Sequence, residues 1–108
     1  FTYVDNVVEA NLLALHSPEP AGRVFDIACQ KPTTLNQLLA ILQRLIGVDV
    51  PACFAPPRPG DLRHSLADIS LARKLLRYAP TITTDEGLRS TVRYWAAAVN
   101  NPWPGRHP

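Results

Sequence analysis

Methionine is absent from this sequence, whose 108 residues begin at Phe1. We interpret the chain as a trimmed or truncated piece of a longer polypeptide. Long apolar runs are missing as well, since none approaches the roughly 20 residues that a helix needs to span a bilayer. Because 46% hydrophobic and 19% charged residues are an ordinary globular balance, we expect a soluble domain with no membrane partner.

Excess charge of one sign is missing, and cysteine is scarce. The 11 basic and 9 acidic residues leave a formal net charge of +2, which is too little to indicate nucleic-acid binding. We therefore expect no nucleic-acid partner. Cys29 and Cys53 form no CxxC pair and have apolar neighbours, so we expect two buried free thiols, as in a reducing cytoplasm. A disulfide between them is the alternative.

Glycine, histidine and serine are too scattered to form a familiar catalytic site. A dinucleotide fingerprint and a P-loop both need several glycines within about eight residues, but the five glycines lie at positions 22, 47, 60, 87 and 105. The histidines lack zinc-ligand spacing, no serine lies in a GxSxG turn, and no tyrosine is followed four residues later by lysine. We expect no catalytic residue, metal site or cofactor site in this chain.

Proline, by contrast, is abundant. Eleven prolines punctuate the chain and leave four gaps that are long enough for a helix, because proline breaks helix interiors. Each gap opens with a helix start signal. The predicted helices and their capping residues are 6–16 with Asn6 and Glu9, 35–46 with Thr34 and Gln37, 69–77 with Asp68, and 84–99 with Thr83 and Glu86.

Short runs that are rich in strand-forming residues lie outside these helices. Residues 22–28 alternate between two faces, with Phe25 and Ile27 on one of them. Residues 1–4 and 52–55 are the other candidates. We therefore expect an α/β chain, mixed α+β when isolated, with about four helices and two to four short strands.

One loop carries residues that suit a ligand with a phosphate and a sugar diol. Arg58 can donate bidentate hydrogen bonds to phosphate oxygens, and Asp61 can accept hydrogen bonds from two hydroxyls. The alternative is an ordinary surface turn in which Arg58 and Asp61 pair with each other, since Pro-Gly-Asp is a common turn sequence.

Several segments in order resemble a known family. They are FTYVDNVV (residues 1–8), VFDIA (24–28), TLNQL (34–38) and RPGDLRHSLADISLA (58–72). This order resembles the C-terminal part of extended short-chain dehydrogenases. Within that superfamily it is most similar to NAD-dependent nucleotide-sugar epimerases and dehydratases of the UDP-glucose 4-epimerase type.

The resemblance implies roles for three residues. Arg58 would contact the diphosphate of the nucleotide-sugar, Asp61 would hold the ribose, and Leu35 would line the base pocket. It also implies that the intact enzyme uses NAD, and that the glycine-rich loop and the catalytic Tyr-x-x-x-Lys lie in an N-terminal part which precedes this chain. One departure is that Gln30 stands where the family often has glycine.

Two hypotheses follow. In the first, residues 1–99 are the nucleotide-sugar-binding region of an NAD-dependent epimerase or dehydratase, an isomerase or lyase that would be inactive as this chain alone. In the second, the chain is a stand-alone interaction module that pairs with another copy or with a separate N-terminal cofactor-binding chain. Strand edges at 24–28 and exposed Trp95 or Trp103 would drive that pairing. Residues 100–108 are expected to be a flexible or docking tail.

Overall fold

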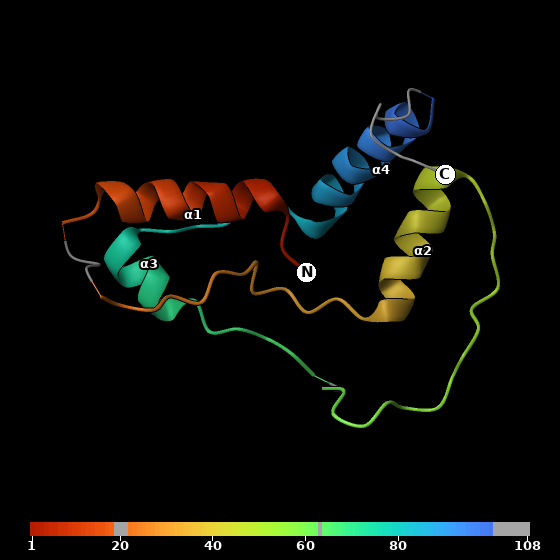
Figure 1. Cartoon of the computed structure of the whole chain (residues 1–108), viewed down its shortest axis with the longest axis horizontal. Helices are drawn as coiled ribbons and strands as arrows, with labels where there is room; N and C mark the ends of the chain where they lie inside the picture. Colours follow the sequence, from red (N-terminus) through yellow and green to blue (C-terminus); the bar gives the residue numbers. More distant parts are fainter. Residues whose placement is uncertain (19–21, 63, 101–108) are drawn as a thin grey trace, which may run out of the picture.

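The structure, a computed structural model, describes residues 1–18, 22–62 and 64–100, apart from the side chain of Asn100. Its helices are α1 (Val4–His16), α2 (Leu35–Ile46), α3 (Ser70–Leu76) and α4 (Thr84–Asn100). Helices α1 and α3 pack together at one end and α2 and α4 at the other, and the long segment between α2 and α3 arcs away from all four (Figure 1). The predicted tail and Trp103 lie outside the described residues.

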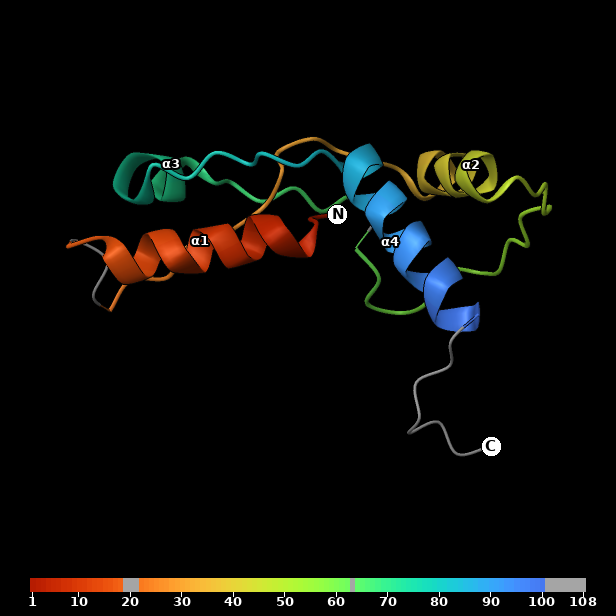
Figure 2. The same cartoon turned by 90° about the horizontal axis from the view of Figure 1, so that it is seen from above.

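The view from above shows the same two pairs of helices, with the start of α1 close to the start of α4 (Figure 2). The first helical turn of α4 and the residue before α1 are in close contact, because a Cβ atom added to Gly87 would lie 2.7 Å from the Cβ atom of Tyr3. The two pairs of helices therefore meet at the N-termini of α1 and α4.

Helices α2 and α4 begin where the capping signals predict. Thr34 N–H donates to the side chain of Gln37 at 2.8 Å, and Gln37 N–H donates to the Thr34 hydroxyl at 3.1 Å, which makes a reciprocal capping box. Thr83 and Glu86 make the same pair of contacts at the start of α4. Gly47 ends α2 with a φ of +77°, a left-handed conformation that glycine adopts without strain.

The predicted start of α1 is wrong. This helix begins at Val4, with Tyr3 as an N-cap that makes no side-chain hydrogen bond. Asn6 is fully buried within the first turn, and its side chain bonds to a segment about 75 residues away rather than capping its own helix. Asp68 is also displaced by one position, because α3 has Ile69 as its N-cap while the Asp68 carboxylate accepts from Ser70 N–H at 2.9 Å.

The predicted strands are wrong, and with them the α/β fold class. The described part of the chain is all-α, with four helices and no strand. A strand exists only when its backbone N–H and C=O groups pair with a neighbouring strand, and the described residues offer 22–28 and 52–55 no such neighbour. In the other predicted strand, Tyr3 caps α1 and Val4 is already helical.

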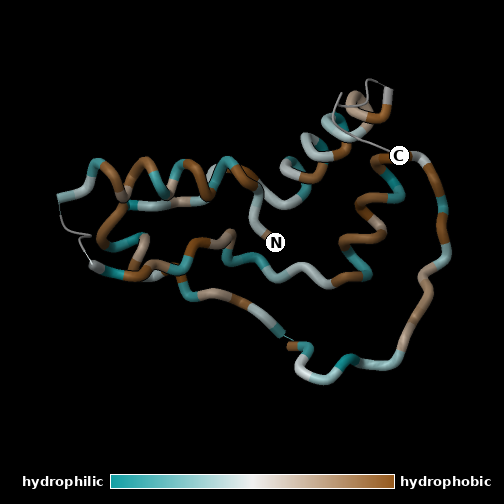
Figure 3. The backbone as a smooth tube through the Cα atoms, viewed as in Figure 1, coloured by the Kyte–Doolittle hydropathy of each residue, from teal (hydrophilic) through white to brown (hydrophobic). Residues whose placement is uncertain are grey.

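The apolar core is small and lies between α1 and α3. Its fully buried members are Ala10, Ile69, Ala72, Leu76 and Tyr78. The partly buried residues that pack on it are Leu13, Ala14, Phe25, Ile27 and Ala28. Helix α2 buries none of its residues completely, although apolar residues recur along it (Figure 3). The two helix pairs are therefore unequal, and only the α1–α3 end has a closed core.

The molecule is open for its size. It exposes 9068 Å² of surface, whereas a compact monomer of this mass exposes about 6,000 Å². Its radius of gyration is 17.4 Å, against about 13 Å for a compact domain of this length. Large apolar side chains are consequently exposed on α1, on α4 and along the segment between α2 and α3.

The prediction that both cysteines are buried is wrong. Both thiols are free, but Cys29 is only half-buried and Cys53 is exposed. Cys53 lies in the long segment between α2 and α3, where no layer of structure covers it. No helix in the described ranges is long and apolar enough to cross a membrane.

Candidate functional site

The loop that carries Arg58 and Asp61 forms a tight turn. Asp61 N–H donates to the Arg58 carbonyl at 3.2 Å, and Gly60 has a φ of +87°. Proline at the second position and a left-handed glycine at the third are typical of a type II turn. The turn therefore follows from the local sequence, because Pro59 restricts the backbone and only Gly60 takes its conformation without strain.

The side chains on this turn are available to a ligand. Arg58 and Asp61 are exposed, and neither forms an ion pair or a side-chain hydrogen bond with another described residue. The expected alternative, in which the two side chains pair with each other, is therefore not what the structure holds. Leu35 is 74% exposed at the first residue of α2. The structure brings Arg58 and Asp61 together on one turn and places Leu35 on a separate element.

An open pocket lies a few residues beyond the turn. It has a volume of about 260 Å³ and is lined by Gln30, Leu66, Ala67 and Asp68. Gln30 has a φ of +53°, which is unusual for a residue other than glycine. Sequence reasoning missed this pocket as a site. The available signal was that Gln30 stands where the resembled family often has glycine, which marks a special backbone position.

Asp68, which lines this pocket, forms hydrogen bonds with the first residue of α3. Its carboxylate accepts hydrogen bonds from the hydroxyl and the backbone N–H of Ser70. The hydrogen bond from the hydroxyl, followed by that from the N–H, lowers the pKa of Asp68 below its ordinary value. Asp68 therefore stabilises the start of α3 from the residue before the N-cap Ile69.

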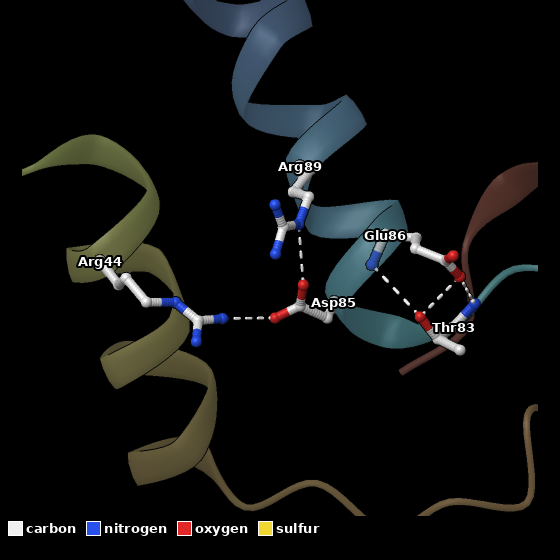
Figure 4. A network of polar contacts seen from close by, with 5 residues as sticks. All are labelled: Arg44, Thr83, Asp85, Glu86 and Arg89. Carbon is white, nitrogen blue, oxygen red and sulfur yellow. Dashed lines mark hydrogen bonds and ion pairs between the residues drawn. The ribbon is translucent and has the colours of Figure 1, made fainter.

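A second polar cluster joins α2 to α4. Asp85 lies between two arginines, with Arg44 Nη2 at 2.6 Å and Arg89 Nε at 2.9 Å (Figure 4). The hydrogen bond from Arg89 lowers the pKa of Asp85, and the charges of both arginines add to this effect. The hydroxyl of Thr83 likewise lowers the pKa of Glu86. The ion pair between Arg44 and Asp85 therefore links α2 to α4.

These carboxylates predict a loss of stability in acid. In Asp68, Asp85 and Glu86 the folded-state pKa lies below the unfolded value, so the unfolded chain binds protons more readily. Their stabilisation is complete above the unfolded pKa values, near 4, and is lost as the pH falls through the folded ones. Urea unfolding followed by circular dichroism at pH 7, 5, 4 and 3 should show this decline. Asp85→Asn should flatten it, and an unchanged slope would contradict the assignment.

The described residues do not fit NAD. A dinucleotide diphosphate is held at a helix N-terminus whose N–H groups are free and whose approach is lined with glycine. Here acidic side chains lie at three helix starts, with Asp5 on α1, Asp68 before α3 and Glu86 on α4. The start of α2 is occupied by its own capping box. No group of three or more potential metal ligands occurs in the described ranges either.

The chain is similar in sequence to several curated epimerases, although no protein-family profile matches it. It is 34% identical to a UDP-glucuronate 4-epimerase of Thermodesulfobacterium geofontis, over 87% of this chain and 29% of that protein. It is 32% identical to a UDP-glucose 4-epimerase of Mycolicibacterium smegmatis, over 88% of this chain and 30% of that protein. The chain therefore spans less than a third of the length of these relatives.

Two solved structures have the same fold over the matched part. One is a UDP-glucose 4-epimerase of Thermotoga maritima with UDP-glucose, at a TM-score of 0.84 and 38% identity, over 92% of this chain and 31% of that one. The other is a variant UDP-glucuronic acid 4-epimerase of Bacillus cereus with a UDP-sugar analogue and NAD, at a TM-score of 0.82 and 28% identity, over 90% of this chain and 31% of that one. This chain is therefore a homologue of the C-terminal part of the UDP-glucose and UDP-glucuronate 4-epimerases.

Proposed function

We propose that this chain is the nucleotide-sugar-binding part of an NAD-dependent 4-epimerase, and that it has no epimerase activity alone. The observation that supports this most directly is the turn at residues 58–61. It presents a guanidinium and a carboxylate that are exposed and unpaired among the described residues. Two of the solved relatives of this chain are complexes with a UDP-sugar or its analogue.

In this proposal Arg58 donates to the diphosphate and Asp61 accepts from the ribose hydroxyls. The type II turn holds the two groups three residues apart on a rigid backbone, which limits the entropy lost when they bind. Leu35 would offer its exposed side chain to the base. The role of the region is to grip and orient the substrate, and positioning of this kind supplies a large part of enzymatic rate enhancement.

Cofactor binding and catalysis are assigned to the part of the relatives that this chain does not match. In the proposed intact enzyme that part holds NAD, which supplies transient oxidation of the sugar. None of the described helix starts in this chain suits the dinucleotide, so we assign it no residue that contacts NAD. Mixing NAD and UDP-glucose with this chain alone should therefore give no UDP-galactose.

Titration with UDP and UDP-glucose, followed by amide chemical shifts, tests the binding claim. We expect millimolar affinity, with the largest shifts at residues 58–61. Arg58→Ala should weaken binding at least about tenfold, since hydrogen bonds to charged groups contribute about 1.5–3 kcal/mol. Arg73→Ala is the matched control, because Arg73 is an exposed arginine on α3, and it should leave the affinity unchanged. Absence of shifts at millimolar ligand, or equal losses in both variants, would reject the claim.

The second candidate function is the interaction module, in which copies of the chain pair with one another. The observation in its favour is the exposure of large apolar side chains, including Phe54 at 81% and Leu15 at 77%. Sedimentation velocity separates the two candidates. A chain that stays monomeric at high concentration would contradict the interaction module and would be consistent with the epimerase proposal.

A further inference from the structure

The segment that follows α2 is anchored at its start and makes few contacts after that. The anchor is Gln43, whose Nε2 donates to the Asp49 carboxylate at 3.1 Å and to the Val50 carbonyl at 2.7 Å. We call the next residues, 51–62, the strap. All of them are exposed, and their only hydrogen bond among the described residues closes the 58–61 turn. A segment with so few buried contacts and so much solvated backbone moves independently of its neighbours.

Proline makes the strap stiff over short distances. Four of its residues are proline, at positions 51, 56, 57 and 59. Proline fixes its own φ and favours extended backbone in the residue before it, so the strap has fewer conformations than a glycine-rich loop of the same length. A segment that is stiff locally loses less entropy when it docks on the rest of the molecule. The strap is therefore suited to change its position without refolding.

The residues assigned to one nucleotide lie on different parts of the chain. Arg58 and Asp61 are on the strap, whereas Leu35 is the first residue of α2. Figure 1 shows the strap, in light green, away from the four helices, and the 58–61 turn apart from the start of α2. No hydrogen bond or ion pair between described residues joins the strap to α2. A nucleotide held at both places would therefore tie the strap to this helix.

We propose that the structure is an open form, and that a nucleotide which contacts both the 58–61 turn and Leu35 closes the strap onto the start of α2. This inference rests on the proposed function for the roles of these residues. The turn holds the diphosphate and the ribose, and the base reaches the Leu35 side chain, which is 74% exposed in the open form. Ordering of the strap opposes binding, so the affinity of this chain for the nucleotide is low. Inorganic diphosphate has no base and leaves the strap open.

Nitrogen-15 relaxation of the full chain measures the closure. Backbone order parameters at residues 52–55 should lie below about 0.6 in the free chain and rise towards about 0.85 at saturating UDP, the values of flexible and rigid backbone. Inorganic diphosphate that shifts the amides of the 58–61 turn should leave residues 52–55 flexible. Leu35→Ala should bind UDP at least about threefold more weakly and lose the ordering, because the base loses its apolar contact. Leu12→Ala, at a leucine 52% exposed on α1, is the matched control and should do neither.

The prolines of the strap provide a second measurement. Replacing both Pro56 and Pro57 by glycine gives the open strap more conformations to lose on closure, so the affinity for UDP should fall about fourfold or more. Pro18→Gly is the matched control, because Pro18 is exposed and lies outside the strap, and it should leave the affinity unchanged. Circular dichroism of each variant establishes that its helices are intact.

Four results would overturn the closure of the strap. They are residues 52–55 that are rigid in the free chain, UDP binding that leaves them flexible, equal ordering by inorganic diphosphate, and equal UDP affinities of the two proline variants. In each case UDP still shifts the amides of the 58–61 turn, so the proposed function stands while the closure fails. Absence of those shifts would instead reject the proposed function, and the closure with it.

Discussion

Replacing Asn6 by leucine is expected to lower the free energy of unfolding by about 3 kcal/mol, a large part of what a small domain has. The Asn6 side chain is fully buried, and its Nδ2 donates to the Ile82 carbonyl at 2.8 Å. Its Oδ1 accepts from Thr81 N–H at 3.1 Å and from Ile82 N–H at 3.0 Å. Leucine fills a similar volume but leaves the Thr81 and Ile82 N–H groups without partners, and it leaves the Ile82 carbonyl with only the weak donor Cys29 Sγ at 3.7 Å. Urea unfolding followed by circular dichroism measures the change.

Asn11 offers a matched control on the same helix. Its amide donates to the Val7 carbonyl at 2.8 Å, but its side chain is exposed, so water can replace the contact. Asn11→Ala should change the free energy of unfolding by no more than about 0.5 kcal/mol. If the two variants lost equal stability, Asn6 would not be the link between α1 and the segment that precedes α4.

The second large effect is expected from Gly87→Ala. Alanine normally stabilises a helix by about 1 kcal/mol relative to glycine. At this site, however, the new Cβ atom would lie 2.7 Å from Tyr3 Cβ and 2.8 Å from Tyr3 Cγ. Rotation of the Tyr3 side chain moves its Cγ atom but not its Cβ atom, so the backbone of α4 or of Tyr3 must shift. We expect a net loss of about 2 kcal/mol in the free energy of unfolding, since overpacking typically costs about 1–3 kcal/mol.

The relevant comparison is with an exposed position of the same helix. Arg93→Ala should stay within about 0.5 kcal/mol of the parent chain. The double variant that combines Gly87→Ala with Tyr3→Gly lacks one of the two clashing Cβ atoms. Gly87→Ala should therefore lower the free energy of unfolding less in the Tyr3→Gly background than in the parent chain. A Gly87→Ala chain more stable than the parent would show that helix propensity outweighs the contact between Tyr3 and α4.

The candidate site was predictable from the sequence only in its local part. Arg58, Pro59, Gly60 and Asp61 are consecutive, so the geometry of their turn depends on the backbone preferences of proline and glycine. The relation of this turn to Leu35 was not predictable, because the two lie on different elements and their separation depends on how the chain folds between them. The pocket beside Gln30 was missed for the same reason, since its lining comes from residues 30 and 66–68.

Sequence alone determined the ends of α2 and the start of α4. In each capping box the hydroxyl and the side chain that answers it are three residues apart, so no distant partner is needed. Tertiary structure decided what Asn6 does and whether residues 22–28 form a strand. Asn6 satisfies backbone groups about 75 residues away instead of capping its own helix. Residues 22–28 carry a strand pattern without a strand, because a ladder requires a second backbone that the described chain does not provide.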